Sequence, residues 1–397
     1  MYKCVSWCSC LNGAMFFKSS RLVNMTQKPV RVLQVIGAMD RGGAETLLMN
    51  LYRNIDRNLV QFDFLVNEEN PCDYDSEIQG LGGRIFRIPR YKLFNYCSYK
   101  TACKRFFSQH IYPIVHGHIG FPASIYLNEA SKTGAYTIAH SHAQNYPISP
   151  NEILFRVCAR PVRHVADYFL ACSKEAGIDR FGVEIVEGPS FQILKNGVDT
   201  SVVGFDIKKR AEARAELGLS EDLLVLGHVG RLTEVKNHQF LFKVFNSIHR
   251  RNQRSVLLLA GRGELEPQLR ETAKQMGLSD SIVFLGVRDD IPSLLSAFDL
   301  FIFPSFAEGL PCAVIEAQAS GLPVLLSNGV PDAARILPTT IRLDLSSGAD
   351  AWAESALEAF DICKSNDRNC AKDLIERSGF DIRTSAAWLQ ELYLQHS

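Results

Sequence analysis

The sequence predicts an α/β protein made of two parallel-sheet domains, and three observations support this fold class. The chain has 397 residues, more than the ~100 to 200 of a usual single domain. Short apolar runs alternate with amphipathic helical patterns in two successive series. Strands that are separated by helices form parallel sheets covered on both faces. Two Rossmann-like sheets that face each other would leave a cleft for a ligand.

The first series begins at residue 30 and defines an N-terminal domain over residues 28–197. Ser149 followed by Pro150 and Glu152 predicts the capped start of a helix within it. The predicted strands lie within 30–37, 60–66, 84–88, 113–118, 135–142 and 168–173, and the segment 191–199 is expected to end this half in an Asn-Gly turn.

The second series defines a C-terminal domain over residues 198–380. Residues 1–27 precede both domains and contain neither a membrane-length apolar run nor a signal-peptide pattern. Because Met25 stands just before the first strand, we expect this segment to be a flexible extension, and a misplaced start of the sequence is the alternative. The second series predicts strands within 223–230, 255–261, 282–286, 300–305 and 323–327, and helices near 237–251, 264–276, 291–298 and 311–320.

Composition narrows the function classes. Basic and acidic residues both number 43, so the net charge is zero and gives no general affinity for nucleic acid. The cysteines number 11, an odd count, and several lie within apolar runs, which favours free thiols in the cytoplasm. Cys4, Cys8 and Cys10 are closely spaced, but no second pair of metal ligands follows, so no metal site is expected there.

Glycine and cationic residues follow strands in both halves. Gly42 and Gly43 come directly before the first helix, where a backbone without side chains can approach a phosphate or sugar closely. A tight strand-to-helix turn is the alternative interpretation of this pair. Arg231 and Lys236 follow the first strand of the second half and suit a diphosphate. For either cation alone, a solvated loop charge is the alternative.

The segment 303–325 carries the strongest signal. Glu308 lies in the loop after a strand, and Glu316 lies eight positions later within an apolar helix that Pro311 begins. The backbone N–H groups of 309–312 are then free to bind an anion. A carboxylate in an apolar helix is costly to desolvate unless a hydroxyl or a cation meets it. A surface-facing Glu316 is the alternative.

Two His-x-His pairs end neighbouring strands of the first half. Alternation along a strand places His116 with His118 on one face, and His140 with His142 likewise. Zinc is one ligand for such pairs, but no cysteine or carboxylate lies nearby to complete four ligands. We therefore expect His140 to act on substrate and the other three histidines to pack or line the site.

These motifs together resemble the GT-B glycosyltransferases, specifically the retaining family 4 and its bacterial capsular and exopolysaccharide members. The resemblance runs from about residue 30 to the C-terminus. It is carried by VIGAMDRGGAETLLMNLYRNID, VHGHIG, TIAHSHAQ, FLACSKEAGIDRFG, ILKNGVD, GHVGRLTEVKNH and the segment 303–325.

The resemblance implies a role for each motif. Glu308 would lie beside the transferred sugar, Glu316 would bind the ribose, and His140 would sit at the reaction centre. The last helix, within 381–397, would cross back onto the first domain. The residues implied to bind the donor are Gly42, Gly43, Arg231, Lys236, Gly261, Gly263, Glu264, Val287, Glu308, Gly309, Leu310, Pro311 and Glu316, and those implied to act in catalysis are His140, Glu308, Arg231 and Lys236.

The implied reaction moves a sugar from a nucleotide donor, with UDP the expected nucleotide, to an acceptor hydroxyl with retention and without a metal ion or other cofactor. Rate would depend on fixed positive charge around the departing diphosphate. Two alternatives stay open: a sugar-nucleotide epimerase of the same fold, and a non-catalytic sugar-nucleotide-binding protein.

An acid-poor stretch between residues 78 and 151 predicts where a lipid-linked acceptor would arrive. It contains eight basic residues and one acid. Basic and aromatic helical surface suits an anionic bilayer, here the inner leaflet, although a solvated charged face is the alternative. The residues expected to face the acceptor or membrane are Arg90, Lys92, Lys100, Lys104 and Arg105, with Arg156, Arg160 and Arg163 on one face of the helix after Ser149.

Overall fold

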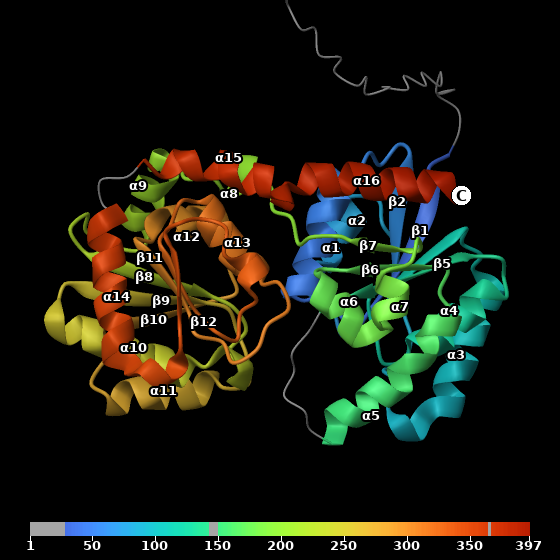
Figure 1. Ribbon diagram of the computed structural model, residues 1–397, viewed down its shortest axis with the longest axis horizontal. Coiled ribbons are helices and arrows are strands. Elements are labelled where there is room, and N and C mark those ends of the chain that lie inside the picture. Colours follow the sequence, from blue (N-terminus) through green and yellow to red (C-terminus); the bar gives the residue numbers. More distant parts are fainter. Residues whose placement is uncertain (1–27, 143–149, 364–366) are drawn as a thin grey trace, which may run out of the picture.

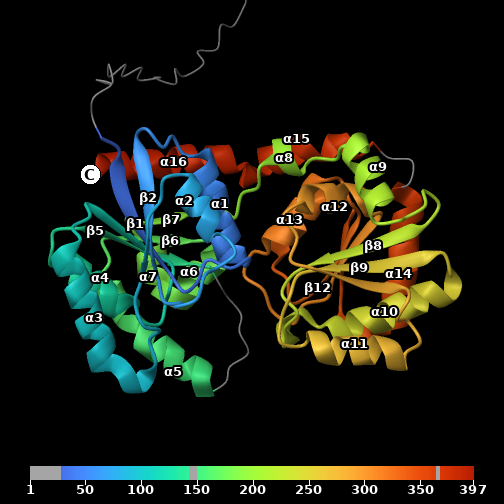
Figure 2. The ribbon, with the colours of Figure 1, turned by 180° about the vertical axis from the view of Figure 1, so that it is seen from behind.

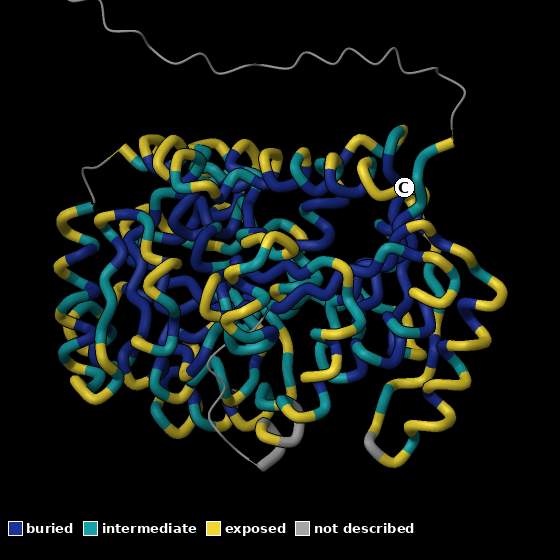
Figure 3. Tube along the Cα trace, turned by 45° about the vertical axis from the view of Figure 1, so that its right-hand side comes forward, coloured by how far each residue is buried: buried dark blue, intermediate teal, exposed yellow. Residues whose placement is uncertain are grey.

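The computed structural model describes residues 28–142, 150–363 and 367–397. It shows two α/β domains side by side, with the last helices running across both of them (Figure 1). The α/β class with two Rossmann-like parallel sheets is confirmed, and most residues of the central strands are buried. Buried stretches of the chain lie inside the molecule, and exposed ones lie on its outside (Figure 3).

The first domain contains a seven-stranded parallel sheet in the order β3-β2-β1-β4-β5-β6-β7. Continuous apolar runs form its central strands because helices cover both faces. Its elements are β1 (Val30–Ile36), α1 (Gly43–Asn54), β2 (Val60–Val66), α2 (Asp75–Gly80), β3 (Ile85–Arg87), α3 (Tyr96–Gln109), β4 (Ile114–Gly117), α4 (Ala123–Ser131), β5 (Tyr136–Ser141), α5 (Pro150–Ala159), β6 (Tyr168–Ala171), α6 (Lys174–Phe181), α7 (Val183–Val186) and β7 (Phe191–Ile193).

The second domain contains a six-stranded parallel sheet in the order β10-β9-β8-β11-β12-β13. The sequence patterns did not predict β13, which is a short edge strand with only one buried residue. The elements are α8 (Thr200–Val203), α9 (Ile207–Glu216), β8 (Leu224–Val229), α10 (His238–Arg251), β9 (Ser255–Ala260), α11 (Glu266–Gln275), β10 (Ile282–Gly286), α12 (Ile291–Ala297), β11 (Leu300–Phe303), α13 (Cys312–Ala319), β12 (Val324–Ser327), β13 (Thr340–Leu343) and α14 (Gly348–Cys363).

The chain crosses between the domains twice, and the two crossings pair with each other. Val198 forms an isolated parallel bridge with Asp381, and its N–H donates to the carbonyl of Phe380 at 2.8 Å. A Cβ on Gly197 would lie 2.9 Å from backbone atoms of Ile382, so only glycine permits this approach. The Asn-Gly turn expected at 196–197 is therefore wrong: the pair marks a crossing between the domains.

After α15 (Ala371–Ile375), helix α16 (Ile382–Gln395) returns to the first domain. It packs against α1 and against β1 and β2, as both ribbon views show (Figures 1 and 2). Ile382, Leu389 and Tyr393 are fully buried in the core of that domain. Ser149, the expected helix cap, lies outside the described residues. Among the residues that are described, no helix combines the length and the apolar character that a membrane span requires.

Candidate active site

The loop after β11 and the turn after β8 meet at the carboxyl edge of the second sheet. Lys236 Nζ lies 2.6 Å from Glu308 Oε1, and both side chains are largely shielded from solvent. Lys236 also lies 4.6 Å above the ring of Phe303, which ends β11. A backbone hydrogen bond also holds the loop that carries Glu308: the N–H of Glu308 donates to the carbonyl of Gly329 at 3.0 Å. Two predicted site residues thus form one rigid ion pair.

A strained residue fixes the position of Lys236. The next residue, Asn237, has φ 55° and ψ 45°, a left-handed conformation that non-glycine residues rarely adopt. Its side chain donates to the carbonyl of Pro304 at 3.2 Å, and Phe306 donates to the carbonyl of Val235 at 2.8 Å. Strain of this kind persists only where the surroundings hold it. The sequence patterns missed Asn237, although asparagine is the non-glycine residue best suited to this conformation.

The predicted donor glycines of the second domain have a structural reason. A Cβ on Gly261, whose φ is +141°, would lie 2.0 Å from the carbonyl oxygen of Gly230. A Cβ on Gly263 would lie 2.3 Å from the carbonyl oxygen of Leu232. The loops after β8 and β9 therefore pack backbone against backbone, joined by the 3.0 Å hydrogen bond from Leu232 to the carbonyl of Arg262. These glycines shape the loop edge whether or not a ligand binds there.

Glu316 lies on α13, in the layer between the two domains. Desolvation raises the pKa of its carboxyl to about 7, and the charge of Arg53 from the first domain opposes this only in part. Burial raises the pKa of the thiol of Cys312, the first residue of α13, and the nearby Glu316 carboxyl raises it further. Glu316 is thus a carboxyl with no fixed ion-pair partner among its described contacts, at a position where a hydroxyl-bearing ligand could stabilise its charge.

The first domain meets α13 through its own glycine motif. Cys312 Sγ lies 3.5 Å from the carbonyl oxygen of Gly43, and Asn196 donates to the carbonyl of Leu310 at 2.5 Å. A Cβ on Gly43 would meet open space, whereas one on Gly42 would collide with the carboxylate of Glu45. Burial raises the pKa of Glu45, and the charge of Arg231 from the second domain opposes this increase in part. The sequence analysis did not identify Asn196 or Glu45 as site residues.

The remaining predicted donor residues line the same edge of the second sheet. Val287 directly follows β10 and is half-buried, and Glu264 is exposed after Gly263. Pro311 precedes α13, whose first N–H groups have no side-chain cap. Gly309 and Leu310 lie in the loop between Glu308 and this helix. The structure therefore brings the predicted second-domain residues to one edge of the sheet.

Four histidines gather at the corresponding edge of the first sheet. His116 and His140 stack with ring centroids 5.3 Å apart, and His140 and His142 lie 4.0 Å apart. His118 Nδ1 lies 2.8 Å from His142 Nε2. Burial lowers the pKa of every member, to about 3 for His116 and about 4 for His142. The cluster is therefore uncharged at neutral pH.

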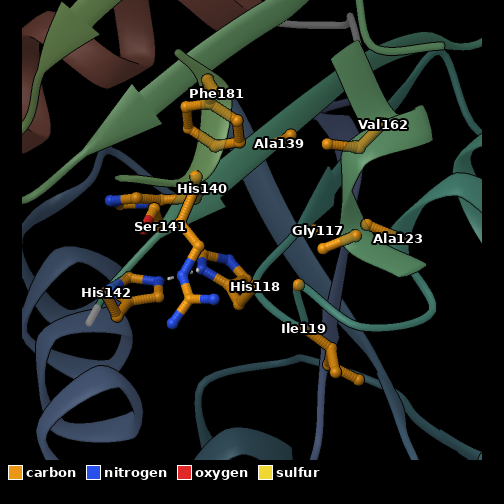
Figure 4. Close-up of a pocket in the computed structure, with 13 residues that line it drawn as sticks. Gly117, His118, Ile119, Ala123, Ala139, His140, Ser141, His142, Val162 and Phe181 are labelled. Carbon is orange, nitrogen blue, oxygen red and sulfur yellow. Dashed lines mark hydrogen bonds between the residues drawn. The ribbon is translucent and has the colours of Figure 1, made fainter. Parts of the chain in front are cut away.

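A cavity of about 340 Å³ opens beside this cluster, and every residue that lines it belongs to the first domain. His118, His140 and His142 face one another on one side of it, and Phe181, Val162 and Ala123 lie around the rest (Figure 4). His140, the predicted reaction-centre residue, is 4% exposed, and neither of its ring nitrogens has a hydrogen-bond partner among the described residues. A buried polar atom without a partner calls for an explanation, such as a catalytic role, stored strain, a bound ion or an ordered water.

The cluster also has the composition of a metal site. His116, His118 and His140 each place one ring nitrogen within 4.8 Å of the others. Zinc binds imidazole nitrogen at about 2.0–2.1 Å, so three ring nitrogens this near one another are candidate zinc ligands. The stacked rings of His116 and His140 face each other rather than a shared centre. The expectation that the protein works without a metal ion therefore stays a prediction.

Only part of the predicted basic surface is exposed to solvent. Six of its members are exposed, namely Arg90, Lys92, Lys100, Lys104, Arg105 and Arg160. Arg156 pairs with Asp179 at 2.9 Å, and Arg163 packs against Gly182. The expectation that Arg156, Arg160 and Arg163 share one helical face is wrong. Helix α5 ends at Ala159 and a 3-10 helix follows, because Pro161 lacks the N–H that an α-helix needs.

Comparison with known proteins identifies the family. The profile of the family described as glycosyl transferases group 1 matches residues 209–340. EpsF of Bacillus subtilis (strain 168), provisionally assigned as a glycosyltransferase, is 34% identical over 377 residues, covering 94% of this chain and 97% of EpsF. The chain belongs to the group 1 glycosyltransferases. This agrees with the contact of Lys236 with Glu308 in the segment that the profile matches.

Other relatives of this group 1 glycosyltransferase match part of its sequence or share its fold. The UDP-Gal:alpha-D-GlcNAc-diphosphoundecaprenol alpha-1,3-galactosyltransferase of Escherichia coli is 34% identical over 160 residues, 40% of this chain and 39% of that protein. The crystal structure of Anabaena HepE in complex with UDP-glucose has a TM-score of 0.73 at 17% identity, covering 92% of this chain and 99% of HepE. The structural likeness to HepE confirms the GT-B arrangement of the two domains.

Proposed function

We propose that this protein transfers a sugar from a UDP-linked donor to a hydroxyl of a glycan or lipid-linked acceptor, with retention, in exopolysaccharide or capsule synthesis. The identity with EpsF supports the glycosyltransferase class. A relative named for UDP-galactose and a diphosphoundecaprenol-linked acceptor supports the donor and acceptor classes. The structural likeness to HepE, which was crystallised with UDP-glucose, agrees with this donor.

The ion pair of Lys236 with Glu308 is the observation that carries this proposal. A donor diphosphate would take the Lys236 ammonium and release Glu308 to accept hydrogen bonds from the sugar hydroxyls. Lys236, Arg231 and the uncapped N-terminus of α13 would then surround the leaving diphosphate with positive charge. Such charge stabilises the transition state as the sugar–phosphate bond breaks. We expect that it serves in place of a metal ion.

For retention, we propose that the acceptor hydroxyl attacks the face of the sugar from which the diphosphate leaves. The leaving phosphate would take the proton of that hydroxyl. Glu316 would bind the ribose through its partly desolvated carboxyl. The cavity beside His140 is the site that we assign to the acceptor, because its walls are mainly apolar and its polar lining combines uncharged imidazoles with Ser141 and the cation Arg180.

The test is an assay with a panel of UDP- and GDP-sugars and a lipid extract, in which nucleotide release and glycolipid formation are measured. We expect one UDP-sugar to release UDP only when the lipid extract is present. Nucleotide release without acceptor would favour an epimerase or hydrolase instead. An unchanged anomeric configuration in the glycolipid, measured by NMR, would support retention, and an inverted one would contradict it.

We also propose that the first domain rests on an anionic bilayer. Phe94 is 86% exposed next to Lys92, and Tyr96 is 46% exposed next to Lys100. Aromatic side chains interleaved with cations suit the boundary of a bilayer. Flotation with vesicles of anionic lipid should show binding that salt weakens and that Phe94→Ser reduces.

A matched control for this flotation is Ile111→Ser. Ile111 is 77% exposed but lies beyond the other end of α3. Equal losses from Phe94→Ser and Ile111→Ser would mean that no particular face docks, and no binding by the wild type would contradict the membrane proposal.

A further inference from the structure

A second cavity of the first domain, the aromatic cavity, has a volume of about 380 Å³ and lies outside the site described above. Ser124 and Asn128 line it from α4, where a spacing of four residues places them on one face of the helix. Phe121 lines it from the turn before α4, and Tyr91 lines it from the segment before α3. The mechanism proposed above does not use this cavity.

Aromatic rings form one wall of the aromatic cavity. Tyr91 and Phe121 have ring centroids 5.2 Å apart, with planes inclined by 56°. The ring of Tyr91 also packs edge-on against the fully buried Tyr99 at 5.2 Å, which holds it in place. Burial raises the pKa of the Tyr91 hydroxyl, and the nearby Cys158 and Tyr96 raise it further. Because both of these neighbours line the cavity, the hydroxyl of Tyr91 lies on its cavity side.

The aromatic cavity also contains polar groups that can still bond a ligand. Within the described part of the chain, no residue forms a hydrogen bond with the side chain of Ser124, Asn128 or Tyr91. Glu129, which also lines the cavity, is 5% exposed and has Oε1 2.6 Å from Lys132 Nζ. Its second carboxylate oxygen can still accept a hydrogen bond. The cavity thus offers hydroxyl, amide and carboxylate groups beside an aromatic wall.

This combination selects a sugar ring rather than a hydrocarbon chain. A chain that filled the cavity would take the amide of Asn128 and the hydroxyls of Ser124 and Tyr91 out of water without giving them hydrogen bonds, which is unfavourable. A sugar supplies hydroxyls to these groups. Its polarised C–H bonds also suit the negatively charged face of an aromatic ring. The volume of the cavity falls within the ~300 to 1,000 Å³ that is usual for ligand sites.

The aromatic cavity adjoins the cavity beside His140, the histidine cavity, which is assigned above to the acceptor. The two share a wall formed by the start of α4 and the end of α5 with the 3-10 helix that follows. In each of these neighbouring pairs, the first residue lines the histidine cavity and the second lines the aromatic cavity: Gly120 and Phe121, Ala123 and Ser124, Ala159 and Cys158, Val162 and Pro161.

The aromatic cavity also reaches the surface that is proposed to face the bilayer. Tyr96, which is 46% exposed, and Lys100 both line it, and the membrane proposal places these two residues at the bilayer boundary. A glycan attached to a lipid at that boundary would meet the aromatic cavity and the histidine cavity together.

We propose that the aromatic cavity is a second sugar site, which binds a further sugar ring of the acceptor glycan while the ring to be extended lies in the histidine cavity. This inference rests on the proposed function, because it takes the histidine cavity as the acceptor site. It names the acceptor class as a glycan of at least two sugars, in place of a lipid that carries a single sugar.

Asn128→Leu distinguishes a sugar from a hydrocarbon occupant. Leucine has nearly the size of asparagine but forms no hydrogen bonds, so this change should weaken the binding of a sugar and strengthen that of a chain. Leucine also favours a helix more than asparagine does, so the variant should fold. Ser131→Ala is the matched control. Ser131 is the exposed last residue of the same helix, and its hydroxyl donates to the backbone carbonyl of Asn128 at 3.1 Å.

The first measurement is NMR of the isoleucine δ1 methyl groups in the full chain. Ile125 lines the aromatic cavity and Ile119 lines the histidine cavity, so each cavity has its own reporter. The probes are the methyl glycosides of glucose, galactose, mannose and N-acetylglucosamine, with geranyl phosphate as a hydrocarbon probe. We expect at least one glycoside to shift Ile125 in the wild type and in Ser131→Ala. Asn128→Leu should need about fivefold more of that glycoside, and geranyl phosphate should leave Ile125 unshifted.

Three results would overturn the sugar site, whatever reaction the protein catalyses. The first is that none of the glycosides shifts Ile125, even if Ile119 responds. The second is that Asn128→Leu binds the glycoside as tightly as the wild type does. The third is that geranyl phosphate shifts Ile125 and binds Asn128→Leu more tightly, which would assign the aromatic cavity to a lipid chain.

The second measurement is steady-state transfer to lipid-linked acceptors that carry one sugar or two. We expect Asn128→Leu to raise the acceptor KM about fivefold for the acceptor with two sugars and to leave it unchanged for the acceptor with one. The kcat and the donor KM should stay close to the wild-type values. Equal changes of KM for both acceptors would contradict a second sugar site. Absence of transfer by the wild type would remove the proposed function, whereas the shifts of Ile125 would still decide whether the cavity binds sugar.

Discussion

The two sheets of this glycosyltransferase share one topology but carry opposite chemistry at their carboxyl edges. Both place their strands in the order third, second, first, fourth, fifth, sixth, and the first sheet adds β7. The carboxyl edge of the second sheet carries a cation and a carboxylate in contact, Lys236 and Glu308. The carboxyl edge of the first sheet carries four imidazoles that burial keeps uncharged.

This difference teaches that the fold provides the edge and that the loops provide the chemistry. A charged edge suits a ligand that carries charge throughout the reaction, as a nucleotide diphosphate does. An uncharged hydrogen-bonding edge beside a mainly apolar cavity suits a hydroxyl, which needs orientation rather than neutralisation. The predictions below test this division between the two edges.

The largest effect is expected from Lys236→Ala. Removal of one fixed positive charge from a leaving group costs about 10²- to 10³-fold in kcat, and Glu308 would also lose its partner. Transfer should fall by at least this factor while circular dichroism and melting stay close to wild type. Lys243→Ala, an exposed site on α10, is the control and should leave kcat unchanged. Near-normal turnover of both Lys236→Ala and Glu308→Gln would remove the catalytic assignment.

His140→Ala should have the next largest effect on kcat. This effect should concern the acceptor rather than the donor. Loss of an imidazole at the acceptor cavity should lower kcat about tenfold to 10²-fold and leave the donor KM unchanged. Initial rates with each substrate varied in turn separate the two effects. A rise in donor KM without a change in kcat would place His140 on the donor side and break the division between the edges.

A smaller effect, on stability, distinguishes the glycines of the two domains. Gly261→Ala should destabilise the fold by about 2 to 3 kcal/mol, because it combines overpacking with backbone strain, given the 2.0 Å approach to Gly230. Gly43→Ala meets open space and should change the free energy of unfolding by less than about 1 kcal/mol. Denaturant unfolding measures both variants. Equal losses would show that the backbone contact between the loops after β8 and β9 carries little strain.

The smallest predicted effect is a pH dependence of donor binding through Glu316. Its folded pKa of about 7 lies above the ordinary 4.5, so the unliganded protein loses stability as pH rises between these values. A ribose hydroxyl stabilises the ionised form, so donor affinity should rise roughly tenfold from pH 6 to pH 8. Calorimetry should detect proton release near pH 6.5. Glu316→Gln should bind more weakly at pH 8 and show a flat profile.

Much of the fold was predictable because it depends on local patterns. All six strands predicted for the first half formed, since alternation of apolar runs with helices is a short-range signal. β13 was missed because it has only one buried residue and depends on pairing with β12. The Asn-Gly pair at 196–197 looked like a turn, and only the return of α16 to Gly197 explains its conformation.

The candidate site was predictable to the extent that motifs follow strands. Lys236 and Glu308, 72 positions apart in the chain, were both assigned from their loops and are in contact. Tyr393 and Asn237 could not be found in this way. Tyr393, whose hydroxyl lies 2.6 Å from His116 Nδ1, is 277 positions away from it in the chain and follows no motif, and the role of Asn237 depends on a backbone angle that tertiary contacts impose. Gln34 could be noticed in the sequence as one polar residue inside an apolar strand. The sequence did not indicate which residues its side chain would contact.

Binding of UDP by the wild type, Lys236→Ala and His140→Ala, measured by calorimetry without acceptor, separates the two edges most directly. If charges of the second domain hold the diphosphate and imidazoles of the first domain hold the acceptor, Lys236→Ala should weaken UDP binding at least tenfold. His140→Ala should bind UDP as the wild type does. Equal UDP affinity of Lys236→Ala and the wild type, or a tenfold loss in His140→Ala, would contradict this division.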